Sequence, residues 1–130
     1  MRVTVIGAGY VGLTTGLTLG VCMHITEAAR RVNMRQRELA VAKLQQELKV
    51  LQGRTIGVLG LSFKPHTDDL RDSAAVDVAL RLLDLGVRVR AHDPCALARA
   101  RRELLHADIE LCDSLADLAD DADALLLATE

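Results

Sequence analysis

The residues best suited to chemistry lie in one polar loop, within residues 57–73. An apolar run precedes this loop and an Ala/Val/Leu-rich run follows it, so we expect it to join a buried strand to a helix. Loops of this kind line the ligand sites of open α/β sheets. The cations Lys64 and Arg71 favour an anionic ligand such as a phosphate. An ordinary loop with solvated charges explains the same residues equally well.

A second motif follows the β-branched run of residues 2–6 and has the spacing G-x-G-x-x-G. In a dinucleotide-binding turn these glycines permit a tight turn and let the backbone approach a pyrophosphate. The acid expected about 20 residues later, on a second strand, is missing. That region reads instead as a basic helix with Glu27 inside it. The cofactor-binding candidates of this motif are Gly7, Ala8, Gly9, Tyr10, Val11 and Gly12.

Composition indicates a globular chain of 130 residues, half of them apolar, with a formal net charge of −2. This charge gives no general reason to expect a nucleic acid or a membrane as partner. The cysteines, Cys22, Cys95 and Cys112, are widely spaced and form no Cys-x-x-Cys pair, and the four histidines are equally scattered. We therefore expect no metal site, buried thiols and a cytoplasmic location.

Residues 3–23 carry no charge, which a signal peptide or a membrane span would also explain. Gly7 and Gly9 would weaken a helix there, and the threonines lower its hydropathy. The dinucleotide motif explains the segment better.

A long helical pattern without Gly or Pro covers residues 25–51, and Gly53 follows where a C-terminal cap is expected. A helix of about 25 residues spans about 37 Å, which is longer than a small domain needs. We therefore expect it to connect two domains or to form a homodimer interface over residues 24–52.

After Gly53, strands and helices alternate with short loops, which is typical of a parallel sheet with helices on its faces. Ser73 and Ser114 stand where helix N-caps are expected. The fold class is therefore α/β. The predicted strands are 55–61, 87–92, 109–112 and 123–129, and the predicted helices are 73–85, 95–105 and 114–119.

Residues 63–73 read Phe-Lys-Pro-His-Thr-Asp-Asp-Leu-Arg-Asp-Ser and follow Gly-Val-Leu-Gly-Leu at 57–61. This closely resembles the UDP-binding domain of UDP-glucose 6-dehydrogenase and related nucleotide-sugar dehydrogenases. Residues 89–94 and 122–130 resemble the second and fourth strands of that domain. Residues 32–36 resemble the end of the central helix of the family, and residues 3–20 resemble the start of its NAD domain.

The resemblance implies three regions. Residues 1–23 are a remnant of an NAD-binding Rossmann domain, residues 24–52 a central or dimerisation helix, and residues 53–130 an incomplete Rossmann-like UDP-binding domain. The N-terminal strand and its glycine turn have lost their usual sheet neighbours. We expect them to stand isolated or to add to an edge of the remaining sheet.

The family oxidises UDP-glucose to UDP-glucuronate with NAD, through a cysteine-bound thioester. By resemblance, Phe63 and Lys64 contact the UDP-sugar, Arg71 reaches NAD across the domain cleft, and residues 7–12 hold the NAD pyrophosphate. Asp68, Asp69 and Asp72 are expected to shape the loop by bonding backbone groups or pairing with Arg71.

The block that carries the catalytic residues of the family has no counterpart between the glycine turn and the long helix. No cysteine here lies in the motif of the nucleophile, so we assign no catalytic residue. The leading interpretation is a nucleotide-sugar dehydrogenase fragment that retains partial UDP-sugar binding and is inactive alone. The alternatives are a non-enzymatic dimerisation module built on the long helix and a small NAD-binding domain.

Overall fold

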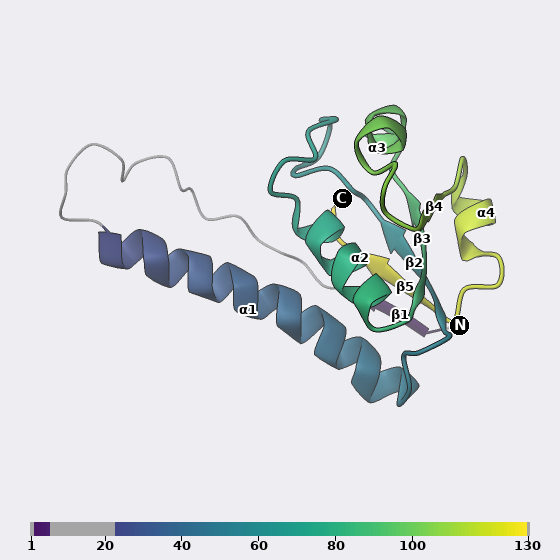
Figure 1. The fold of residues 1–130 in the computed structure, drawn as a ribbon, viewed down its shortest axis with the longest axis horizontal. Helices are drawn as coiled ribbons and strands as arrows, with labels where there is room; N and C mark the ends of the chain where they lie inside the picture. Colours follow the sequence, from purple (N-terminus) through teal and green to yellow (C-terminus); the bar gives the residue numbers. More distant parts are fainter. Residues whose placement is uncertain (1, 6–22, 130) are drawn as a thin grey trace.

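A computed structural model describes residues 2–5 and 23–129 of the chain. These ranges contain five strands and four helices, and strands and helices alternate from β2 onward (Figure 1). The elements are β1 (Arg2–Val5), α1 (Met23–Leu48), β2 (Thr55–Leu59), α2 (Ala74–Asp84), β3 (Arg88–His92), α3 (Leu97–Glu103), β4 (Ile109–Leu111), α4 (Leu115–Ala119) and β5 (Ala124–Leu127).

The strands form one parallel sheet in the order β1-β5-β2-β3-β4, with helices packed against it (Figure 1). Counted from β2, the order β4-β3-β2-β5 is the 3-2-1-4 order of a doubly wound half-sheet. The predicted α/β class and Rossmann-like parallel sheet are therefore confirmed.

The first strand is not isolated. β1 pairs in parallel with β5, with Val3 opposite Leu125 and Val5 opposite Leu127. The expectation of an isolated strand is wrong, and the edge-addition alternative is confirmed. Backbone N–H and C=O groups along the outer side of β5 need hydrogen-bond partners, and an added strand supplies them. The glycine motif at 7–12 lies outside the described residues.

The two faces of the sheet bury different clusters of side chains. Ile56 and Val58 on β2 pack with residues of α1, α2 and α3 in the main core. Side chains alternate along a strand, so the intervening Gly57 faces the other side. A Cβ on Gly57 would meet Leu125 at 2.6 Å and Leu118 of α4 at 3.1 Å. The absence of a side chain at Gly57 therefore lets α4 lie close to the sheet.

Helix α1 ends earlier than the sequence pattern indicates. Its last residue is Leu48, and Lys49 then takes the left-handed conformation, with φ 64°. The chain turns there, and this turn buries the side chain of Leu51 in the core. Gly53, which we expected to be the C-terminal cap, lies in the next turn and donates its N–H to the Gly86 carbonyl at 2.8 Å.

The second half of α1 packs on the body, through the buried residues Ala40 and Leu44 against α2. The first half reaches beyond the sheet (Figure 1). The two predicted serine caps are confirmed, because Ser73 accepts from the Val76 N–H and Ser114 from the Asp117 N–H. No helix in the described ranges has the length and hydropathy needed to cross a membrane.

Leu44 tests the docking of α1, because its side chain is 1% exposed in the core. We expect Leu44→Ala to lower the free energy of unfolding by about 2–5 kcal/mol, through lost burial and the cavity left behind. The control is Leu105→Ala, a residue that is 74% exposed. Urea denaturation followed by circular dichroism measures both. Equal stability of the two variants would show that α1 does not dock on the sheet.

Candidate functional site

The candidate site lies at the carboxyl ends of β2, β3 and β5. The connection from β2 leads to β3 on one side, while β5 lies on the other, so the strand order reverses between β2 and β5. Ligands of open α/β sheets bind at this switch point. A hollow of about 430 Å³ opens there. Its lining residues are Leu59, Gly60, Ser62, His66, His92, Asp93, Pro94, Cys95, Leu115, Leu127 and Thr129.

Gly60 and Thr129 close the floor of this hollow. Gly60 has φ 80°, and a Cβ there would lie 2.6 Å from the Thr129 carbonyl oxygen. The Thr129 hydroxyl donates to the Ser62 carbonyl at 2.8 Å. The chain leaving β5 therefore lies directly against the turn that leaves β2, and only glycine permits this approach.

Asp93, at the end of β3, ties two turns together. One carboxylate oxygen accepts from the N–H groups of Leu61 at 2.7 Å and Ser62 at 2.9 Å. The other accepts from the N–H groups of Cys95 at 2.8 Å and Ala96 at 2.7 Å. The residue is 2% exposed, so nearly all of this bonding is shielded from water.

Burial raises the pKa of Asp93, but the four N–H donors outweigh burial and hold the pKa below its ordinary value. The carboxylate therefore stays ionised inside the fold. In a dinucleotide-binding turn, the N–H groups after the first strand face the pyrophosphate, and the acid after the second strand binds ribose. Here the acid itself occupies those N–H groups, so this turn does not fit a dinucleotide.

The Lys64 loop, residues 62–72, closes on itself by short bonds. The Phe63 N–H donates to the Asp69 carbonyl at 2.7 Å, and the Thr67 hydroxyl donates to the Lys64 carbonyl at 3.0 Å. Phe63 is half-buried, whereas Lys64 is exposed and forms no ion pair with any residue in the described ranges. The loop therefore presents the Lys64 ammonium group to solvent.

Arg71 forms a bidentate ion pair inside the same loop. Its Nε and Nη2 donate to the two oxygens of Asp69 at 2.9 and 2.7 Å. The guanidinium and the Arg71 N–H together hold the pKa of Asp69 well below its ordinary value. The expectation that Asp69 shapes the loop by pairing with Arg71 is confirmed. The Arg71 side chain remains 78% exposed, and its contact with NAD stays a prediction.

The cysteines and histidines divide by exposure. Cys112 is buried, and burial raises the pKa of its thiol. Cys95 is exposed at the hollow, so the expectation of a buried thiol is wrong there, because the turn after Pro94 lies at the surface. His92 is buried, and its Nδ1 donates to the Cys112 carbonyl at 2.9 Å. Across the described residues, no three acidic, histidine or cysteine side chains group as metal ligands.

Sequence reasoning missed the roles of Gly60, Asp93 and Thr129. A signal existed for Asp93, since it is the acid at the end of the second strand of the half-sheet, where a ribose-binding acid is expected. No sequence signal shows that its carboxylate instead bonds four N–H groups. That arrangement depends on the distance between two turns 30 residues apart along the chain.

We expect Asp93→Asn to lower the free energy of unfolding by ~3 kcal/mol at pH 7, because buried N–H groups lose a charged acceptor. The folded pKa lies below the unfolded value of about 3.9, so the carboxylate stabilises the fold above that pH. This contribution is lost as the pH falls through the folded pKa, and the difference from wild type shrinks below about pH 4.

Urea titrations from pH 3 to pH 7 measure the difference in free energy of unfolding between wild type and Asp93→Asn. The exposed Asp108→Asn is the control. A difference that stays constant over this range would contradict the assignment.

Comparison with known proteins agrees with this geometry. Residues 57–130, more than half of the chain, match the model of the UDP-glucose/GDP-mannose dehydrogenase family, UDP binding domain. The UDP-glucose 6-dehydrogenase YwqF of Bacillus subtilis is 37% identical over 107 residues, covering 82% of this chain and 24% of that protein. The UDP-glucose 6-dehydrogenase of Pseudomonas aeruginosa is 41% identical over 116 residues, which cover 85% of this chain and 26% of that protein.

Solved structures give the same result. A UDP-glucose dehydrogenase from the archaeon Pyrobaculum islandicum superposes with a TM-score of 0.76 and 42% identity, over 82% of this chain and 24% of that one. A GDP-mannose dehydrogenase from Pseudomonas aeruginosa superposes with a TM-score of 0.66 and 27% sequence identity. This match covers 82% of the present chain and 26% of the dehydrogenase chain. The chain thus spans about a quarter of the length of these relatives. It belongs to the UDP-glucose/GDP-mannose dehydrogenase family and carries the UDP binding domain of that family.

Proposed function

We propose that the chain binds the UDP portion of a UDP-sugar at the carboxyl edge of its sheet. The observation that carries this proposal is the switch-point hollow between β2 and β5, with the Lys64 loop leading from the same turn. In a complete family member this binding would serve the oxidation of UDP-glucose to UDP-glucuronate. The domain boundaries at residues 23 and 52 are part of the same proposal.

The chemistry of the hollow suits a nucleoside diphosphate. Pro94, Leu115 and Leu127 offer apolar surface to a base, and Leu115 is 59% exposed. Asp93 already occupies the backbone N–H groups of the turn, so a diphosphate has to be held by side chains. Lys64 has no ion-pair partner within residues 2–5 and 23–129, so its ammonium can serve that purpose, and an ammonium binds phosphate as a point charge. Phe63 is proposed as a second substrate contact.

NAD, the cofactor that the resemblance implies, does not fit the turn after β2, because Asp93 occupies its N–H groups. Arg71 is a better candidate for an NAD contact than that turn. Its guanidinium is largely exposed, and among the described residues it pairs with the carboxylate of Asp69. We therefore keep Arg71 and residues 7–12 as proposed NAD contacts. No hydride-transfer step is assigned to the described residues.

The first test of this proposal is Lys64→Gln, which removes the ammonium group and keeps a polar side chain of similar length. We expect the Kd for UDP to rise about tenfold or more, because a charge-assisted bond contributes about 1.5–3 kcal/mol. Amide NMR titration with UDP measures the Kd, with the exposed Lys43→Gln as matched control. Wild-type amides of residues 61–71 that do not shift at millimolar UDP would refute the proposal.

A second proposal concerns α1, which we infer pairs with α1 of a second copy of this chain. Val32 and Leu39 are 56% and 41% exposed. They are seven residues apart, and seven residues make nearly two turns, so both lie on one face. Leu39 precedes the buried Ala40 by one residue, about 100° around the helix, so this exposed face lies beside the side that packs on the sheet. A helix of 26 residues spans about 39 Å, long enough to present this face beyond the sheet.

Val32→Glu tests the pairing by placing a charge on the exposed apolar face. Light scattering at high concentration is expected to give wild type twice its chain mass of 14.1 kDa, and the variant only once that mass. Burying an unpaired carboxylate in the interface opposes association. The control is Leu105→Glu, a still more exposed site in the turn after α3, which should remain dimeric. A monomeric wild type would contradict the inference.

A further inference from the structure

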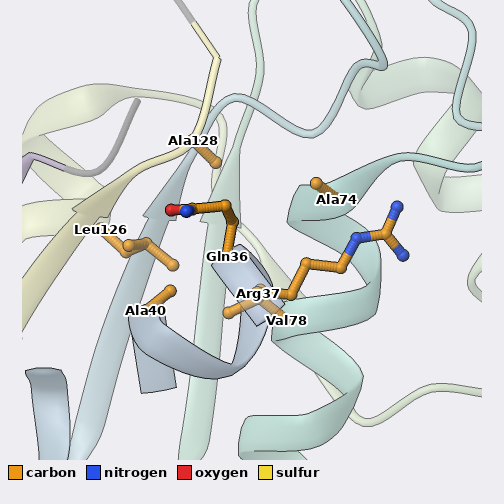
Figure 2. Close-up of a pocket in the computed structure, with 7 residues that line it drawn as sticks. All are labelled: Gln36, Arg37, Ala40, Ala74, Val78, Leu126 and Ala128. Carbon is orange, nitrogen blue, oxygen red and sulfur yellow. The ribbon is translucent and has the colours of Figure 1, made fainter. Parts of the chain in front are cut away.

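One side chain of α1 bonds directly to the end of the Lys64 loop. Arg37 Nη2 donates to the Asp72 carbonyl at 3.3 Å, and its Nη1 lies 3.3 Å from the Asp77 carboxylate on α2. The side chain is 22% exposed. Figure 2 shows it reaching past Ala74, at the first turn of α2, while the neighbouring Gln36 points the other way.

Asp72 is the last loop residue before the N-cap of α2, and it takes the left-handed conformation with φ 56°. Aspartate is one of the few residues besides glycine that tolerate this conformation, and here it reverses the direction of the chain just before α2. The next residue, Ser73, donates its hydroxyl to the Leu61 carbonyl at 2.6 Å. The bond from Arg37 therefore acts at the point where the loop is folded back onto the turn that leaves β2.

The setting of Arg37 indicates a fixed position. Its Nε is buried and has no hydrogen-bond partner among the described residues. Beside it, a hollow of about 30 Å³ lies between α1, α2 and β5 (Figure 2), with room for about one water molecule. Burying an N–H group without a partner costs free energy, so this position of the Arg37 side chain is unfavourable at Nε. The bonds of Nη1 and Nη2 to Asp77 and Asp72 must offset that cost. Asp77 is itself held by Arg81 at 3.0 Å.

We propose that Arg37 is a positioning residue that couples the placement of α1 to the conformation of the Lys64 loop. The coupling passes through two hydrogen bonds. The Arg37 guanidinium bonds the Asp72 carbonyl, and the adjoining Ser73 bonds the Leu61 carbonyl in the turn after β2. The proposal rests on the proposed UDP site, because Lys64 lies on the loop that Arg37 holds. Arg37 itself contacts no ligand in this scheme.

The decisive variant is Arg37→Gln, studied in the full chain by amide NMR and by titration with UDP. We expect amide shifts at residues 63–73 without ligand and a rise of about fivefold in the Kd for UDP, the lower end of typical coupling between sites. Arg35→Gln is the matched control, because Arg35 is exposed on the same helix. It should change neither quantity.

Asp77→Asn separates loop positioning from simple docking of α1. It removes the ion pair with Arg37 and leaves the Asp72 bond, so we expect a lower melting temperature and a Kd for UDP within about twofold of wild type. Equal Kd changes in Arg37→Gln and Asp77→Asn, or none in Arg37→Gln, would overturn the proposal. If Arg37→Gln does not fold, Arg37→Lys keeps the charge but cannot span both partners, and it should shift the same loop amides.

If wild type does not bind UDP, the proposed UDP site fails while the ligand-free loop amides of Arg37→Gln still decide the positioning role. Unshifted amides in that spectrum would refute the coupling by themselves.

Discussion

The buried carboxylate of Asp93 is the constraint on which the carboxyl edge of the sheet depends. It accepts from four backbone N–H groups, two in the turn after β2 and two at the start of the α3 segment. A charged acceptor satisfies these buried donors more strongly than a neutral one. The same bonds decide what the site can hold, because the N–H groups that would bind a pyrophosphate are already satisfied. The chain thus keeps the Rossmann architecture and leaves ligand charge to the loop side chains.

A second constraint comes from outside the half-sheet. Helix α1 packs through Ala40 and Leu44 on α2, and Arg37 extends that contact to the end of the Lys64 loop. The loop is therefore closed internally by the bond from the Phe63 N–H to the Asp69 carbonyl, and its end is tied down by Arg37 at Asp72 and by the adjoining Ser73 at the Leu61 carbonyl. The exposed ammonium of Lys64 lies on the segment that these bonds constrain. A pre-organised loop loses less entropy when it binds a ligand.

Much of the fold could be predicted from periodicity. The alternation of apolar runs and helical patterns after residue 53 gave every strand and helix from β2 to β5, with ends correct within about two residues. The end of α1 was placed too late, because apolar spacing continues to Leu51 while the chain already turns at Lys49. The sequence shows that Leu51 is apolar and so predicts its burial. It does not show that Leu51 reaches the core from a turn and not from the helix. The edge pairing of β1 with β5 was one of two alternatives, since no local pattern chooses a partner strand.

The sequence by itself determined the α/β class, the serine caps, and the Phe-Lys-Pro…Thr-Asp-Asp…Arg segment that places the chain in its family. These features depend on neighbours along the chain, where side-chain period and capping chemistry act. Only the tertiary structure decided that Asp93 bonds backbone rather than ligand, that Gly60 must admit Thr129, and that Arg37 holds Asp72. Each of these depends on the distance between segments 30 or more residues apart, which packing of the whole sheet sets.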